Sequence, residues 1–136
     1  MADYQKLAAA AIKAKDRAYA PYSGFHVGAA LLSSDGEIFI GCNVESAAYP
    51  ATICAERTAL VKAVSEGILT FAAIAIAGGK PNNAPDFCYP CGVCRQLLNE
   101  FASDDFKVII AKTEEDFRVH PWGEILPYGF GPKDLA

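Results

Sequence analysis

The segment Phe71-Ala72-Ala73-Ile74-Ala75-Ile76-Ala77 is an apolar run with no polar alternation. Such a run is typical of a strand buried on both faces, so it predicts a central strand of a sheet that is covered on both sides. Helical patterns flank it over residues 53–66, which end at Gly67, and over about residues 91–101. A second buried strand is predicted at residues 106–111.

The rest of the chain supplies further elements around this centre. An amphipathic helix is predicted over residues 3–18, followed by a hairpin whose Asp35-Gly36 turn tolerates positive φ. The other expected elements are strands at 25–33, 37–42 and 117–119 and a helical turn at 122–126. Because β-α-β units are right-handed and parallel, this order predicts an α/β fold, a three-layer α-β-α sandwich with a mixed central sheet of about five strands.

Composition excludes several classes of protein. The chain has 136 residues, 52% of them apolar and 21% charged, which predicts one folded domain over residues 1–136 and excludes disorder. The net charge is −4 and basic residues form no run, so a long nucleic acid is not expected as a partner. No segment is apolar enough to span a bilayer or to act as a signal peptide, so a cytoplasmic protein that does not bind membranes is expected.

Three of the five cysteines stand where helices are predicted to begin. Cys54 opens one helix, and Cys91 and Cys94 open the next. A helix N-terminus favours the thiolate, and the two helices flank the central strand, whose carboxyl end is where open α/β sheets bind ligands. The three sulfurs can therefore meet at one point. Three protein ligands leave the fourth position of a zinc ion open, which is typical of a catalytic site.

Two side chains beside Cys54 have predicted roles at such a centre. Glu56 does not share a helix face with Cys54, so it is poorly placed as a ligand but well placed to take a proton from a metal-activated water. Three thiolates leave zinc with a net charge of −1, which weakens it as a Lewis acid. Arg57 lies on the face of Cys54 and is predicted to donate to the thiolates.

These residues resemble a known family. Cys54-Ala55-Glu56 followed by Pro90-Cys91-Gly92-Val93-Cys94 is similar to the signature of zinc-dependent nucleoside and nucleobase deaminases. The resemblance is strongest to the small cytidine deaminases that form homotetramers, and it covers nearly the whole chain. It includes Ala20-Pro21-Tyr22-Ser23, Gly41-Cys42-Asn43-Val44-Glu45, and Leu126-Pro127 through Phe130-Gly131-Pro132.

The resemblance implies an enzyme of pyrimidine salvage. It would hydrolyse cytidine and 2'-deoxycytidine to uridine or deoxyuridine and ammonia, with one zinc per subunit activating the water that attacks C4. Cys54, Cys91 and Cys94 would hold the zinc and Glu56 would shuttle protons.

The resemblance also implies substrate contacts. Asn43 and Glu45 would bind the ribose hydroxyls, Phe25 and Phe130 would enclose the base, the Ala55 N–H would hold O2, and the Tyr89 carbonyl would accept from the departing amino group. Phe130 would come from a neighbouring subunit, and Ala47 and Tyr49 would lie at the ribose end of a neighbour's site. Many relatives have serine in place of Tyr89. Because the implied contact is made by the main chain, the difference need not matter.

Other interpretations remain open at this point. Cys88 could complete a closed, structural four-cysteine zinc site, although Pro90 extends the chain before the helix and carries Cys88 away. The spacing of these cysteines also resembles part of a ferredoxin motif, and Cys91 with Cys94 could form a redox dithiol. His26 and His120 are read as structural residues, with no base or metal paired with either. Within the enzyme class, a deaminase of another aminopyrimidine, such as blasticidin S, is the nearest alternative.

Overall fold

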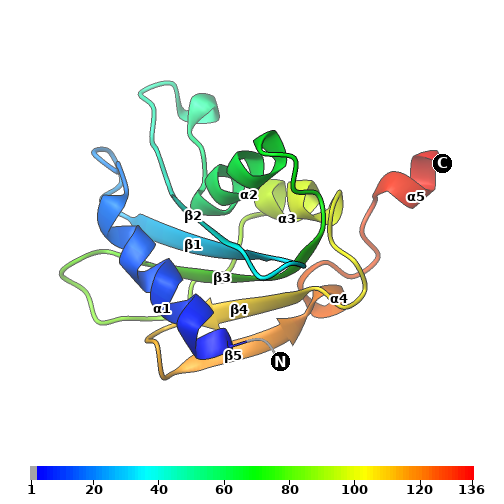
Figure 1. Ribbon diagram of the computed structural model, residues 1–136. Coiled ribbons are helices and arrows are strands. Elements are labelled where there is room, and N and C mark those ends of the chain that lie inside the picture. Colours follow the sequence, from blue (N-terminus) through cyan, green and yellow to red (C-terminus); the bar gives the residue numbers. More distant parts are fainter. Residues whose placement is uncertain (1–2) are drawn as a thin grey trace.

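The computed structural model describes residues 3–136, and its centre is one mixed sheet (Figure 1). The strand order is β2-β1-β3-β4-β5. The strands are β1 (His26–Ser33), β2 (Ile38–Cys42), β3 (Phe71–Gly79), β4 (Lys107–Ala111) and β5 (Phe117–Pro121). β3 and β4 run parallel, while the β1–β2, β1–β3 and β4–β5 pairs are antiparallel. The predicted five-strand mixed sheet is confirmed.

Helices cover both faces of the sheet, as the apolar run at residues 71–77 predicts. α1 (Tyr4–Ala14) covers one face, and α2 (Ala55–Ser65) and α3 (Gly92–Asn99) cover the other (Figure 1). On β3, the alanines at 73, 75 and 77 pack with α1, while Ile74 and Ile76 pack with α2. Because both faces of β3 are buried, one with small side chains and one with large ones, this strand shows no polar alternation.

Short elements complete the chain. The Asp3 side chain caps α1 by accepting from the Lys6 N–H at 3.0 Å. The end of the predicted first helix is a tighter 3-10 turn, η1 (Lys15–Arg17). The others are η2 (Tyr49–Ala51), α4 (Trp122–Ile125) and α5 (Pro132–Leu135), of which η2 and α5 were not predicted from the sequence. Within residues 3–136, no helix has the length and apolar character needed to cross a bilayer.

Two glycines allow the helices to dock directly on strand backbone. A Cβ on Gly28 of β1 would lie 2.0 Å from the Ala11 carbonyl oxygen of α1. A Cβ on Gly41 of β2 would lie 2.5 Å from the Ala59 nitrogen of α2. Neither distance leaves room for a methyl group, so the spacing between sheet and helices depends on glycine at both positions.

Two segments extend beyond the layered body. The connection between β2 and α2, which contains η2, projects above the sheet, and the C-terminal segment with α5 stands away from it (Figure 1). Their side chains include exposed apolar groups. Tyr49 is 72% exposed, Phe130 57% and Leu135 80%. In an isolated chain these side chains face water.

Candidate metal centre and active site

The N-termini of α2 and α3 bring three sulfurs together. Cys54 is the N-cap of α2, Cys91 is the N-cap of α3, and Cys94 lies one turn into α3. The three Sγ atoms lie within 4.8 Å of one another. Within residues 3–136 they are the one group of three or more potential metal ligands with this spacing. Neither Glu56 nor Cys88 belongs to it.

The chemistry and spacing of this cluster fit a zinc ion. At Zn–S distances of about 2.3 Å, tetrahedral geometry separates two sulfurs by roughly 3.8 Å. The Cys54 and Cys91 sulfurs are 3.6 Å apart, which is far too long for a disulfide bond of about 2.05 Å. Cys94 is buried and Cys91 is exposed, so one side of the cluster faces solvent. Three thiolates with an accessible side could hold a metal ion and leave one position for water.

Hydrogen bonds lower the pKa of the Cys54 thiol. The Cys94 thiol, followed by Arg57 and Cys91, lowers the pKa of Cys54 to about 5 against the opposing effect of burial. The pKa of Cys94 is raised, first by this same bond with Cys54 and then by burial. The bond between these two thiols therefore favours the thiolate on Cys54 and the protonated thiol on Cys94. Metal binding displaces such protons, because only thiolates coordinate.

Arg57 lies beside the Cys54 sulfur. One guanidinium nitrogen, Nη2, lies 3.7 Å from Cys54 Sγ and donates to the Thr52 carbonyl at 3.1 Å. The Nε of Arg57 is buried and has no hydrogen-bond partner among the described residues. The positive charge offsets part of the negative charge that the thiolates collect.

Glu56 is a buried carboxyl in the first turn of α2. Its side chain is 3% exposed. Burial raises the pKa of the Glu56 carboxyl, and the Cys54 thiolate adds to the rise. A carboxyl group whose pKa is raised accepts a proton more readily, which suits a group that carries protons in catalysis.

Cys88 lies apart from the sulfur cluster. It packs against Gly78, where an added Cβ would come within 2.8 Å of its sulfur. Burial, followed by the charge of Glu56, raises the pKa of the Cys88 thiol to about 11. Cys88 does not belong to the group of sulfurs that lie close enough to share a metal ion. The position of Cys88 therefore disfavours a closed four-cysteine site.

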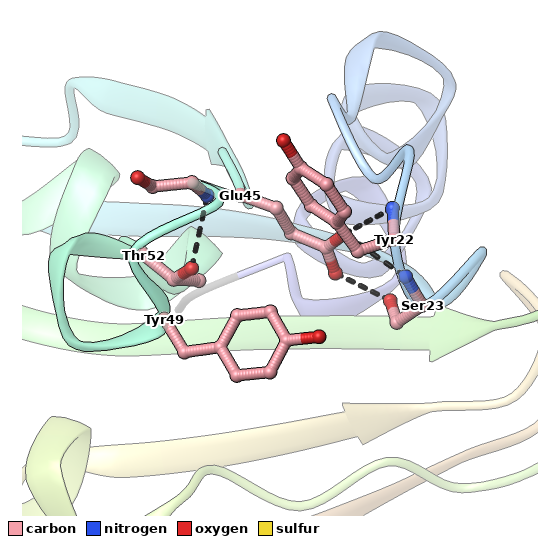
Figure 2. Close-up of a pocket in the computed structure, with 6 residues that line it drawn as sticks. Tyr22, Ser23, Glu45, Tyr49 and Thr52 are labelled. Carbon is pink, nitrogen blue, oxygen red and sulfur yellow. Dashed lines mark hydrogen bonds between the residues drawn. The ribbon is translucent and has the colours of Figure 1, made fainter.

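The two predicted ribose-binding residues reach the same neighbouring segment. Glu45 Oε1 accepts from the N–H groups of Tyr22 and Ser23 at 3.0 and 3.1 Å, and Oε2 accepts from the Ser23 hydroxyl (Figure 2). The hydroxyl, followed by the N–H, holds the pKa of Glu45 below its usual value. The Asn43 side chain donates to the Phe25 carbonyl at 2.8 Å and accepts from the Val27 N–H at 2.9 Å.

Both side chains keep unused hydrogen-bonding capacity. A carboxylate has about four acceptor sites, and three of those on Glu45 are used by Tyr22 and Ser23. An amide has two donors and two acceptor sites, and Asn43 uses one of each. Each residue can therefore make a further bond to a polyol while it stays held in place.

A hollow of about 410 Å³ lies beside Glu45. Tyr22, Ser23, Ser46, Tyr49 and Thr52 line it with Glu45. Tyr22 and Tyr49 meet edge to face, with ring centroids 6.3 Å apart (Figure 2). No cysteine lines the hollow, so it does not contain the sulfur cluster. Ala47 lies in the same projecting loop, just before η2.

The remaining predicted residues lie on three different segments. Phe25 is 38% exposed, just before β1, and its ring edge lies near Gly78 and Cys88. Ala55 is the first residue of α2 and is fully buried. Tyr89 precedes the Pro90-Cys91 step. Phe130 lies in the C-terminal segment, and its carbonyl accepts from Gln96 Nε2 at 2.9 Å and from Asn99 Nδ2 at 2.8 Å. Its ring is not enclosed by its own chain.

Comparison with known proteins identifies the family. The family model described as the cytidine and deoxycytidylate deaminase zinc-binding region matches residues 1–111. The chain belongs to the cytidine and deoxycytidylate deaminase family. Three similar proteins support this assignment. The chain is 42% identical over 134 residues to a cytidine deaminase of Sporosarcina psychrophila, covering 98% of this chain and 96% of the relative.

The other two relatives give the same picture. A cytidine deaminase of Halalkalibacterium halodurans is 44% identical over 133 residues, covering 98% of both chains. The crystal structure of cytidine deaminase from Burkholderia pseudomallei is similar with a TM-score of 0.84 at 44% identity, covering 95% of this chain and 100% of that one. The resemblance in the sequence motifs therefore extends to the fold.

Two features of this deaminase were not predicted from the sequence. His120 was expected to have no paired base, and this is wrong: its Nδ1 lies 2.8 Å from Glu124 Oε1, and its Nε2 lies 2.9 Å from the Tyr89 hydroxyl. His120 lies on β5 and Glu124 on α4, so the helical spacing rule did not apply to this pair and the contact had no signal in the sequence. The bonds from Gln96 and Asn99 to Phe130 had no local signal either, because more than 30 residues separate the partners.

Proposed function

We propose that the protein is a zinc-dependent hydrolase that converts cytidine and 2'-deoxycytidine to uridine or deoxyuridine and ammonia. One observation carries this proposal: three convergent thiols at two helix N-termini, open on one side, lie beside a buried carboxyl group with a raised pKa. Family membership supplies the reaction class. The cysteines at 54, 91 and 94 would hold one zinc per subunit.

Glu56 is the proton carrier of the proposed reaction. A bound zinc supplies a nucleophilic water at neutral pH by lowering the pKa of that water. The Glu56 carboxylate takes the proton that the water gives up and delivers it to N3 of the pyrimidine, which makes C4 electrophilic. The oxygen of that water bonds to C4, and Glu56 takes the remaining proton of this oxygen and delivers it to the amino nitrogen. The C4–N bond then breaks, which releases ammonia and leaves a carbonyl at C4. Because burial raises the pKa of the Glu56 carboxyl, this group accepts a proton more readily than an exposed carboxylate does.

The main chain around the cluster would orient the base. The first N–H groups of a helix have no partner inside the helix, so the Ala55 N–H at the start of α2 is free to donate to O2. The Tyr89 carbonyl would accept from the amino group. Phe25 would cover one face of the base. Held in this way, C4 stays in the geometry that attack requires.

The ribose would be held by Asn43 and Glu45. Both side chains are fixed by bonds to residues 22–27 and each retains capacity for a further bond. Fixed groups lose little entropy when substrate binds, so these contacts would contribute to positioning as well as affinity.

The active form is proposed to be a homotetramer with sites at subunit interfaces. Phe130, 57% exposed on its own chain, would cover a neighbour's base, and Ala47 and Tyr49 would reach the ribose end of a neighbour's site. Burying an aromatic ring of this kind stabilises an assembly by roughly 1.5–3 kcal/mol. The cytoplasm is proposed as the location, because thiolate ligands must stay reduced.

The test combines activity, metal content and a matched pair of variants. The purified protein is assayed for loss of cytidine absorbance and for zinc. Glu56→Gln keeps the shape of the side chain but cannot cycle a proton, so turnover should fall by at least ~10²-fold while zinc stays bound. Glu66→Gln, an exposed carboxylate at the other end of α2, is the control and should match wild type. Full activity in Glu56→Gln, or no deamination by wild type, would overturn the proposal.

A further inference from the structure

Tyr89, which precedes the Pro90-Cys91 step, is bonded through its side chain to the edge strand of the sheet. The Tyr89 hydroxyl lies 2.9 Å from His120 Nε2, and the two rings meet at 60° with centroids 5.4 Å apart. On the other side of the imidazole, Nδ1 lies 2.8 Å from Glu124 Oε1. The chain Tyr89–His120–Glu124 thus joins the loop before α3 to β5 and α4.

Strand register explains why β5 can reach this loop. His120 pairs with Val108 of β4 and Arg118 pairs with Ile110. Val108 and Ile110 belong to the core beneath α2 and α3. Side chains of directly paired residues point to the same face of a sheet. His120 and Arg118 therefore point to the face that carries the sulfur cluster.

Alternate residues of β5 meet alternate residues of the loop. The Arg118 guanidinium lies 3.8 Å above the Phe87 ring centroid, and two residues further along each segment His120 meets Tyr89. An Arg118 nitrogen also lies 3.5 Å from the Tyr89 hydroxyl. Two parallel contacts of this kind fix both the position and the rotation of the loop.

The backbone that follows Tyr89 is also bonded to α4, through the Arg95 side chain. Arg95 Nε donates to the Pro90 carbonyl at 2.8 Å, and its Nη1 donates to the Ile125 carbonyl at the end of α4. The Tyr89 carbonyl differs: within residues 3–136, its one hydrogen-bond donor is the Cys88 thiol, at 4.0 Å. The side chain of Tyr89 and the next carbonyl are held, while the Tyr89 carbonyl keeps its capacity to accept.

We propose that His120, held by Glu124, is a positioning residue that sets the direction of the Tyr89 carbonyl through the Tyr89 phenol. This rests on the proposed function, in which that carbonyl accepts from the departing amino group. Tyr89 would then contribute through its side chain as well as its backbone, and β5 with α4 would be the rigid support of the leaving-group side of the site.

The hydrogen-bond roles within the chain follow from the partners. A carboxylate only accepts, so Nδ1 of a neutral His120 carries the proton and donates to Glu124. Nε2 is then left with a lone pair and accepts from the Tyr89 hydroxyl. This arrangement gives His120 a defined tautomer, which is measurable.

The test compares variants that keep or remove the polar atom facing Tyr89. Tyr89→Phe removes only the hydroxyl, His120→Leu removes the imidazole, and His120→Gln keeps an amide that can accept from the phenol. Loss of one hydrogen bond should lower kcat for cytidine by roughly threefold to tenfold in Tyr89→Phe and His120→Leu, with KM within twofold and zinc unchanged. His120→Gln should recover most of the loss. Tyr4→Phe, on the opposite face of the sheet, is the control.

Two further measurements separate positioning from a general structural effect. The double variant Tyr89→Phe, His120→Leu should be no slower than the slower single variant, because both remove the same contact. The protein has two histidines, so nitrogen NMR, with His26→Asn for assignment, can follow the His120 ring. The Nδ1–H tautomer is expected in wild type, with the Nε2 resonance shifting in Tyr89→Phe.

Each outcome decides the inference. Wild-type kcat in both Tyr89→Phe and His120→Leu, a loss of zinc that matches the loss of kcat, additive losses in the double variant, or an Nε2–H tautomer in wild type would each overturn it. An active wild type with any of these results leaves the proposed function standing. A wild type that does not deaminate cytidine removes both.

Discussion

Replacement of Gly41 by alanine should damage catalysis without touching any functional side chain. Gly41 lies on β2 directly beneath the first turns of α2, the helix that begins at Cys54 and carries Glu56. A Cβ at this position would lie 2.5 Å from the Ala59 nitrogen and 2.6 Å from the Ala55 carbonyl oxygen. Both contacts are with backbone, which cannot rotate away, so α2 and β2 must separate.

The size of the effect follows from these distances. Ordinary contact begins near 3.4 Å, so the nearest atom is about 0.9 Å too close. Overpacking of this kind costs about 1–3 kcal/mol of stability. A displacement near 1 Å at catalytic groups can cost about 10²-fold in rate. Since the strand can take up part of the shift, we expect kcat/KM of Gly41→Ala to fall by roughly tenfold to a hundredfold.

Gly28→Ala provides the matched control. Its Cβ would come even closer to backbone, 2.0 Å from the Ala11 carbonyl oxygen, but the helix it would displace is α1, on the opposite face. Gly123→Ala, with no atom within 4 Å of the added Cβ, controls for the methyl group alone. Thermal unfolding, zinc content and cytidine kinetics at 25 °C should be measured on all three variants.

The expected pattern separates stability from catalysis. Gly41→Ala and Gly28→Ala should both lower Tm, and Gly123→Ala should not. Of the three, Gly41→Ala alone should lose most of its kcat/KM while it is still folded. If Gly41→Ala has a lower Tm yet keeps the wild-type kcat/KM, then β2 moves and α2 does not. That result would contradict the predicted displacement of α2. Equal loss of activity in Gly28→Ala would also contradict it.

The remaining predictions concern the thiols and the C-terminal aromatic ring. Cys88→Ser should keep stoichiometric zinc and activity, because Cys88 is outside the sulfur cluster, and zinc analysis of the variant would expose a four-cysteine site if one exists. In zinc-stripped protein, the rate of alkylation of Cys54 should rise with pH through about 5 and then level off, whereas Cys88 should react slowly until about pH 11. Mass spectrometry of the labelled peptides measures both rates, and faster labelling of Cys88 than of Cys54 at neutral pH would contradict these pKa shifts. Phe130→Ala should raise KM for cytidine strongly, because base stacking contributes about 1–3 kcal/mol, and Phe130→Trp should be milder; a fully active monomer in sedimentation would contradict the shared site.

Local patterns in the sequence were sufficient to predict the elements that hold the sulfur cluster. The apolar run at residues 71–77 indicates a strand covered on both faces because packing on two sides excludes polar residues. Cysteines at positions 54, 91 and 94 stand at predicted helix starts, and helix N-termini on one face of a sheet meet at one edge. The fold and the sulfur cluster follow from these local signals.

Contacts between distant segments had no such signal. The bonds of Glu45 to Tyr22 and Ser23 join residues more than 20 positions apart, and Tyr89 meets His120 across 31. α5 is four residues long, too short for a helical period to show. Exposure of Phe130 could be expected from its flanking glycines, but the carbonyl bonds that hold its backbone depend on where α3 ends.

The two ends of helix α3 belong to two different parts of the molecule. Its N-terminal end holds the sulfurs of Cys91 and Cys94, and at its C-terminal end the Asn99 side chain donates a hydrogen bond to the Phe130 carbonyl. The two ends are about 12 Å apart at 1.5 Å per residue. Because so short a helix moves as one rigid unit, a tilt of its N-terminal end also displaces its C-terminal end. We therefore expect a zinc-poor preparation to show a less ordered C-terminal segment as well as a lower rate.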